Sequence, residues 1–140
     1  MFDLYKSLTI SQFLAALETL NQSIVRCDDD TWSANHIDQP VSRVVFHTLF
    51  FTDLYLHTSL DGFKEQQFHL NNPDFFKDYE EDENRQPTNL YDRPPCEKYM
   101  RFCETKVRSV IGSESEIVLR GESGFGWQKR SRAELHIYNL

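Results

Sequence analysis

Residues 41–60 read VSRVVFHTLFFTDLYLHTSL, and this stretch decides the fold. Arg43 and Asp53 carry its only charges, while Val, Leu and Phe side chains point in almost every direction around a helix. Pro40 stands just before it, where proline is tolerated because the first helical amides need no partner inside the helix. A helix that is apolar nearly all round is central in its domain. We therefore predict that 41–60 is the most buried helix of an all-α domain.

Three further segments carry helical signals around this centre. In 3–26 the apolar residues recur every three or four positions and form one stripe: Ile10, Phe13, Leu14, Leu17, Leu20 and Ile24. The segment 94–112 begins with two prolines and ends in a glycine, which is typical of a complete helix. From Ser131, a capping box with Glu134 starts a last helix whose apolar face begins at Leu135. The four segments predict a single four-helix domain over 1–140.

The connections carry little chemistry of their own. The segment 61–95 is rich in Gly and Pro turn signals, and its acidic run 74–83 predicts a solvated surface, because it lacks the fixed register of a calcium loop. The glycine-rich stretch 121–127 is neither a phosphate-binding loop nor a nucleophile elbow, since the closing Lys and the flanking Gly spacing are absent. We expect it to be a turn in which the chain approaches a neighbour closely.

Composition excludes several classes of protein. The chain has 140 residues, 39% of them hydrophobic, which is enough for one core. Its formal net charge of −7 argues against a dedicated nucleic-acid binder. The polar residues within 44–60 argue against a membrane span. Three cysteines and no basic-then-apolar leader predict a reduced, cytoplasmic protein in which Cys96 and Cys103 are small buried hydrophobes.

The five histidines do not form a metal site by spacing alone. There is no His-x-x-x-His, and His47 and His57 are ten residues apart, so they do not point in the same direction. His47 lies among phenylalanines on the central helix, and we expect it to be buried. From the residues alone it is either a core histidine with a hydrogen-bond partner or a metal ligand. His36, His57, His69 and His136 are expected at the surface or in loops.

Several landmarks occur in a telling order: Trp32 before the second helix, VVFH at 44–47 followed by Leu54-Tyr55, and FGW at 125–127 leading into SRAEL at 131–135. In this order the chain resembles the DinB-like family of metalloenzymes, four-helix up-down-down-up bundles related to thiol-dependent transferases. The resemblance implies that His47 is one ligand of a divalent metal, zinc or nickel. It also implies two more ligands from a His-x-x-x-His on the last helix, with Tyr138 one turn before the first of them as a candidate hydrogen-bond donor near the metal.

That second motif does not occur before Leu140. We therefore expect the 140 residues to be a fragment with an incomplete last helix, one ligand of three, and little metal affinity of its own. Loss of the helix should expose facing side chains, including Leu14, Leu17, Phe51 and Val107, and leave the domain poorly stable.

Two functions remain open at this point. In the first, the complete protein is a metal-dependent hydrolase or thiol transferase that acts on an unknown small molecule, and this fragment is inactive. In the second, the chain is a non-enzymatic helical interaction protein or a remnant. Members of the family are often dimers, so a homodimer is also expected.

Overall fold

The computed structural model describes residues 1–34, 39–76 and 89–140. The long helices are α1 (Phe2–Arg26), α3 (Val41–Leu56) and α6 (Arg93–Ser113). Shorter helices connect or follow them: α2 (Asp29–Trp32), α4 (Gln67–Leu70), α5 (Pro73–Phe76), α7 (Glu116–Arg120) and α8 (Arg132–Asn139). The described residues contain no strand beyond one isolated bridge between Glu122 and Ser131, so the all-α prediction is confirmed for them.

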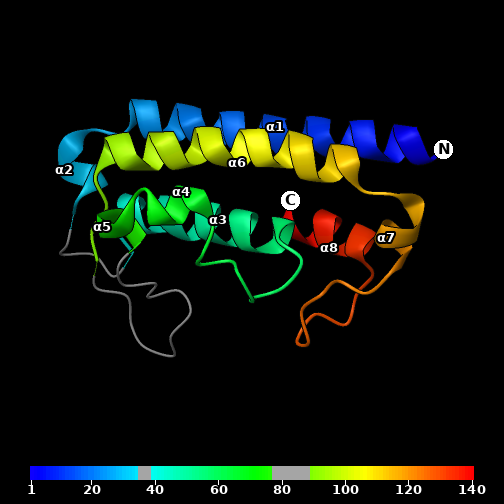
Figure 1. Cartoon of the computed structure of the whole chain (residues 1–140). Coiled ribbons are helices and arrows are strands. Elements are labelled where there is room, and N and C mark those ends of the chain that lie inside the picture. Colours follow the sequence, from blue (N-terminus) through cyan, green and yellow to red (C-terminus); the bar gives the residue numbers. More distant parts are fainter. Residues whose placement is uncertain (35–38, 77–88) are drawn as a thin grey trace.

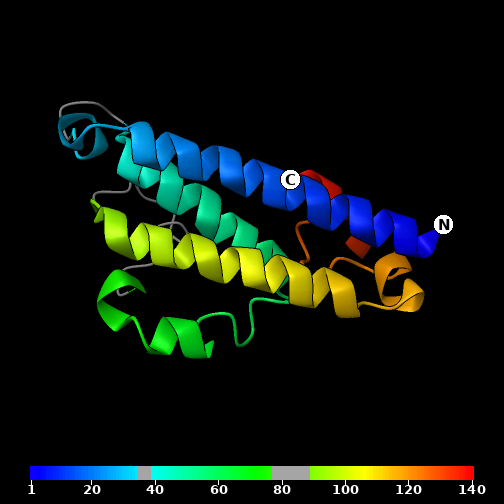
Figure 2. The same cartoon turned by 90° about the horizontal axis from the view of Figure 1, so that it is seen from above.

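The helices form two layers with a side wall. The helices α1 and α6 lie side by side, and α3 and α8 lie beneath them (Figure 1). Seen from above, α4 and α5 flank α6 on the side away from α1 (Figure 2). The helices α3 and α8 run antiparallel: Arg132 at the start of α8 contacts the end of α3, while Asn139 at its end reaches back to Thr52. None of the helices in the described ranges is long and apolar enough to cross a membrane.

The predicted central helix is the most buried one. Ten of the sixteen residues of α3 are buried, a higher share than in any other described helix. The helix ends at Leu56 rather than at 60, because the His57 amide bonds back to the carbonyls of Asp53 and Leu54 and His57 itself turns to an extended conformation. The predicted limits 3–26 and 94–112 agree with α1 and α6 to within one residue.

Aromatic rings fill the space between α3, α6 and the α4–α5 wall. The Phe46 ring stacks on Tyr91 with centroids 3.9 Å apart, and Phe68 stacks on Phe102 at 4.2 Å. The buried Cys96 and Cys103 pack in this core as predicted, and burial raises the pKa of the Cys96 thiol to about 12. The acidic run 74–83 falls mostly on residues 77–88, which lie outside the described residues.

The prediction that Leu14, Leu17, Phe51 and Val107 are exposed is wrong for two of these side chains. Leu17 and Val107 are buried, because α1 and α6 pack directly against each other along their length. Leu14 and Phe51 are half-buried. The core of α1, α3 and α6 therefore depends less on the last helix than the sequence suggested.

Candidate functional site

His47 is exposed, and the prediction that it is buried is wrong. It lies on the face of α3 toward the end of α8, more than one helical turn before Thr52, whose carbonyl accepts from Asn139 of α8. The imidazole packs against the Phe51 ring, with centroids 4.8 Å apart. Its exposure to solvent distinguishes this imidazole from the buried histidines.

A groove of about 350 Å³ runs past His47 between α3 and α8. His47, Phe51 and Tyr55 are spaced by four residues and so form one stripe along α3. Tyr138 and Asn139 of α8 form the opposite wall, and Thr48 and Thr52 complete the lining. The structure therefore brings together His47 and Tyr138, the two site residues selected from the sequence.

The loop 121–131 contacts Tyr55, one of the residues that line this groove. The Tyr55 hydroxyl accepts hydrogen bonds from Trp127 Nε1 at 3.4 Å and from Gln128 Nε2 at 3.2 Å. Gly124 has φ +91°, and a Cβ atom there would lie 1.8 Å from the Thr58 carbonyl oxygen. The predicted close approach of the glycine-rich stretch is thus confirmed, and it fixes the loop against the end of α3.

Tyr138 is half exposed, at 54%, and its ring has two neighbours. The Tyr55 ring lies edge-on at 6.1 Å between centroids, and the Arg130 guanidinium lies over the other part of the ring, 4.3 Å from its centroid. Arg130 comes from the loop, so Tyr138 links the loop, α8 and α3 at the groove.

A buried carboxylate network lies on the other side of α3. Asp53 is fully buried and accepts hydrogen bonds from His69 Nε2 at 2.8 Å and from the Tyr99 hydroxyl at 2.7 Å. The Lys106 ammonium forms an ion pair with the same carboxylate and donates to Gln66 Oε1 at 2.7 Å. Burial raises the pKa of Asp53, but the His69 hydrogen bond and the Lys106 charge outweigh it, so the pKa lies below its ordinary value. The carboxylate therefore stays ionised inside the domain.

A second network joins the ends of three helices. Glu114 at the end of α6 accepts from Arg132 Nε at 2.8 Å and from His136 Nε2 at 2.7 Å. Burial raises the pKa of Glu114, and the bonds from His136 and Arg132 lower it further than burial raises it. The other Arg132 nitrogens donate to the carbonyls of Tyr55, Leu56 and His57, which α3 leaves without helical partners. His136 Nδ1 is buried and has no hydrogen-bond partner.

The expectation that His69 and His136 lie at the surface is wrong for both. Each imidazole is buried because a carboxylate far along the chain accepts its Nε2 hydrogen. His57 is half-buried at the end of α3, and His36 lies outside the described residues. Neither buried histidine opens to a cavity that holds further ligands, so both stabilise the fold.

The described residues do not form a metal site on their own. They contain no group of three or more His, Cys, Asp or Glu side chains that could hold an ion. Around His47 the groove offers only hydroxyl and amide groups besides aromatic rings. Zinc and nickel sites in proteins are built from several imidazole, thiolate or carboxylate ligands. One imidazole does not meet that requirement.

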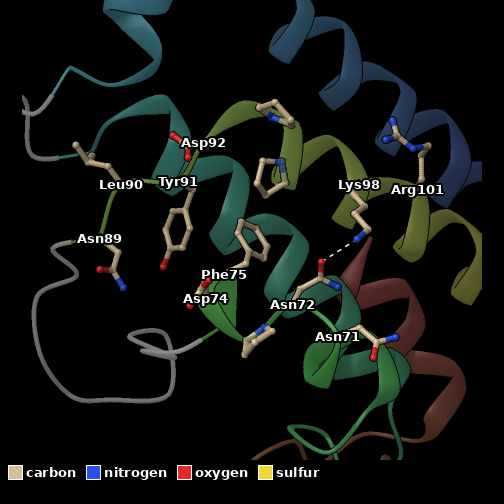
Figure 3. Close-up of a pocket in the computed structure, with 13 residues that line it drawn as sticks. Asn71, Asn72, Asp74, Phe75, Asn89, Leu90, Tyr91, Asp92, Lys98 and Arg101 are labelled. Carbon is tan, nitrogen blue, oxygen red and sulfur yellow. Dashed lines mark hydrogen bonds between the residues drawn. The ribbon is translucent and has the colours of Figure 1, made fainter.

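A larger hollow of about 800 Å³ lies between the first half of α6 and the turn around α5 (Figure 3). Lys98 donates to Asn72 Oδ1 at 2.8 Å across it, and Phe75 and Tyr91 form its apolar part. Asp74 and Asp92 line it as well, so its charges do not favour one class of ligand. We therefore take the His47 groove as the candidate site.

No family model, no curated protein and no solved structure matches this chain.

Proposed function

We propose that the chain is a domain of the DinB-like type with an up-down-down-up four-helix arrangement formed by α1, α3, α6 and α8. The antiparallel contact of α3 and α8 supports this arrangement. The proposed function rests on one observation: the exposed imidazole of His47 lies in a groove between α3 and α8. In this proposal His47 is one ligand of a divalent-metal centre.

The remaining ligands would come from residues that the described part of this chain does not supply. A zinc or nickel ion held by three ligands would provide a Lewis acid for hydrolysis or for thiol transfer. Tyr138, which shares the groove with His47, would place its hydroxyl near that centre. With His47 alone, the 140-residue chain binds metal weakly, because one imidazole cannot replace a closed ligand set.

The test is the metal content of the longest native product of the gene, purified without a metal-affinity tag and measured by elemental analysis. We expect about one zinc or nickel per chain in the wild type and a loss of tight binding in His47→Ala. His57→Ala is the matched control, because His57 follows the end of the same helix but lies outside the groove. Equal metal content in the wild type and in His47→Ala would reject the ligand assignment.

The second candidate function is a helical domain that associates without catalysis. Three large apolar side chains of α3 and α8 favour it, because Val44, Ile137 and Leu140 are each about half exposed. This alternative predicts a metal-free native product that sediments as a dimer, and dissociation of that dimer by Ile137→Glu. If the native product binds metal and sediments with the same mass in the wild type and in Ile137→Glu, the result supports the first candidate instead.

A further inference from the structure

The groove between α3 and α8 is walled by a continuous run of rings. Along α3 the His47 ring contacts Phe51 with centroids 4.8 Å apart, and Phe51 contacts Tyr55 at 5.7 Å. On the side of α8, the Tyr138 ring lies edge-on to Tyr55 at 6.1 Å. Four of the seven residues that line the groove therefore carry rings. Such a wall packs best against another planar ring, through stacked or edge-on contacts.

The other lining residues offer a ligand few hydrogen-bond donors, because the protein already uses them. The Thr48 and Thr52 hydroxyls donate to carbonyls of their own helix, at 2.8 Å in both cases. The Asn139 side-chain nitrogen donates to the Thr52 carbonyl at 3.2 Å. Contact with the rings is therefore the main interaction that this lining offers.

The lining also lacks charged side chains of the usual kinds. Among the described residues that line the groove there is no Asp, Glu, Lys or Arg. Arg130, whose guanidinium lies over the Tyr138 ring, lines a separate hollow formed by the loop 120–131. A charged ligand in the groove would lose part of its hydration without gaining a counter-charge from the lining. The groove therefore favours an uncharged ligand.

We propose that the groove takes a small uncharged molecule built on a planar aromatic ring, and that the ring wall recognises it. A volume of about 350 Å³ lies at the lower end of the range for ligand pockets and suits a molecule of one or two rings. This inference names a substrate class for the site of the proposed function. It rests on the location of that site in the groove, but it does not require the metal.

The probes are three molecules of the same planar shape that differ in charge: benzamide, benzoate and benzamidinium. Cyclohexanecarboxamide is the uncharged counterpart without an aromatic ring. Binding is followed by two-dimensional NMR of the chain at pH 8, above the ordinary titration range of an imidazole. The backbone amides of Thr52 and Tyr138 report on the groove. The indole of Trp32, which is buried in α2 and outside the lining, is the internal reference.

We expect benzamide to shift the groove signals and to bind about fivefold more tightly than each of the other three probes, the size of effect that one aromatic contact supports. Tyr138→Ser should weaken benzamide binding about fivefold, whereas Tyr138→Phe should keep it, because the ring remains. Ile137→Ser is the matched control and should also keep it. Ile137 is the neighbouring residue of α8, it is 58% exposed against 54% for Tyr138, and it does not line the groove.

Several results would overturn the proposal. They are equal binding of the four probes, tighter binding of either charged probe, and no shift in the groove signals. An equal loss in Tyr138→Ser and Ile137→Ser, or in Tyr138→Ser and Tyr138→Phe, would also overturn it. The comparison of the four probes uses the wild type and does not depend on how any variant folds.

The metal measurement separates this inference from the proposed metal centre. The preference for benzamide should be the same with and without EDTA. A native product without metal that still selects benzamide would reject the metal centre and keep the aromatic ligand. A product whose metal depends on His47 but which binds the four probes equally would keep the metal centre and reject the aromatic ligand.

Discussion

A buried carboxylate paired with a histidine and a cation occurs on two sides of α3, but the surroundings of the two carboxylates differ. On one side Asp53 accepts from a histidine and a lysine, and on the other Glu114 accepts from a histidine and an arginine. The Asp53 side is closed: His69 is stacked on Phe76 at 3.8 Å, and Phe63 lies edge-on at 4.9 Å. The Glu114 network is also buried, but it is not covered by such a wall of rings, and it leaves His136 Nδ1 without a partner.

The comparison shows that the two sides of α3 differ in how far neighbouring helices cover them. They do not differ in charge pairing, which both sides contain. The α4–α5 wall brings aromatic rings over the Asp53 network and excludes water from it. The eight residues of α8 cover only the end of α3, and their outward side chains Ile137 and Tyr138 are exposed. A carboxylate–histidine pair by itself is therefore no sign of a site in this molecule.

The largest expected effect is the loss of the closed network. Asp53→Ala leaves the donors of His69, Tyr99 and Lys106 without their common acceptor, and we expect the free energy of unfolding to fall by about 3–5 kcal/mol. Glu114→Ala should lower it by about 2 kcal/mol, because Arg132 keeps its three carbonyl acceptors.

Both values come from urea unfolding followed by circular dichroism. The exposed Asp61→Ala is the control and should change the free energy of unfolding by less than about 0.5 kcal/mol. If Glu114→Ala proved more damaging than Asp53→Ala, the greater contribution assigned to the Asp53 network would be wrong.

An intermediate effect is expected where the loop meets α3. In Gly124→Ala the new methyl group overlaps the Thr58 carbonyl and the backbone keeps a positive φ, so we expect a loss of about 2–3 kcal/mol. Gly126→Ala is the matched control two residues away, since a Cβ atom there meets nothing within 4 Å. Thermal unfolding and Trp127 fluorescence report on the pair. Equal melting temperatures would mean that the loop is not anchored at Gly124.

The smallest effect is a pH dependence of stability, because near neutral pH the stability contributed by these groups does not change with pH. The pKa values of Asp53 and Glu114 are both lowered in the folded chain, so each carboxylate contributes stability that is fully present above its unfolded pKa of about 4. That contribution is lost as the pH falls from there through the folded pKa values. We expect a flat stability profile from these groups between about pH 6 and 8 and a decline below about 4.5. Asp53→Asn should flatten the acid limb, and an unchanged limb would contradict the lowered pKa.

The sequence was informative where a pattern is local. The apolar run of α3, the proline start of α6 and the Ser131–Glu134 capping box each depend on residues within a few positions, and all three are present. The burial of His69 and His136 depends on carboxylates 16 and 22 residues away, which no periodicity reveals. One signal was available: a charged Asp53 in an otherwise apolar stretch needs a buried partner.

Only part of the candidate site could be predicted from the sequence. His47 and Tyr138 were selected and do share the groove, but the exposure of His47 depends on how far α8 covers α3. The metal centre, the DinB-like relationship and the dimer stay predictions.

The contact of Arg132 with the end of α3 also has a consequence for the order of assembly. Its guanidinium binds carbonyls 75 to 77 residues earlier in the chain. Contacts of such high sequence separation form late, because a long loop must close first. During translation, α3 leaves the ribosome well before residue 132 is added, and its final carbonyls remain hydrated in that interval. The most buried helix of the domain is thus completed by a side chain that is synthesised 75 to 77 residues later.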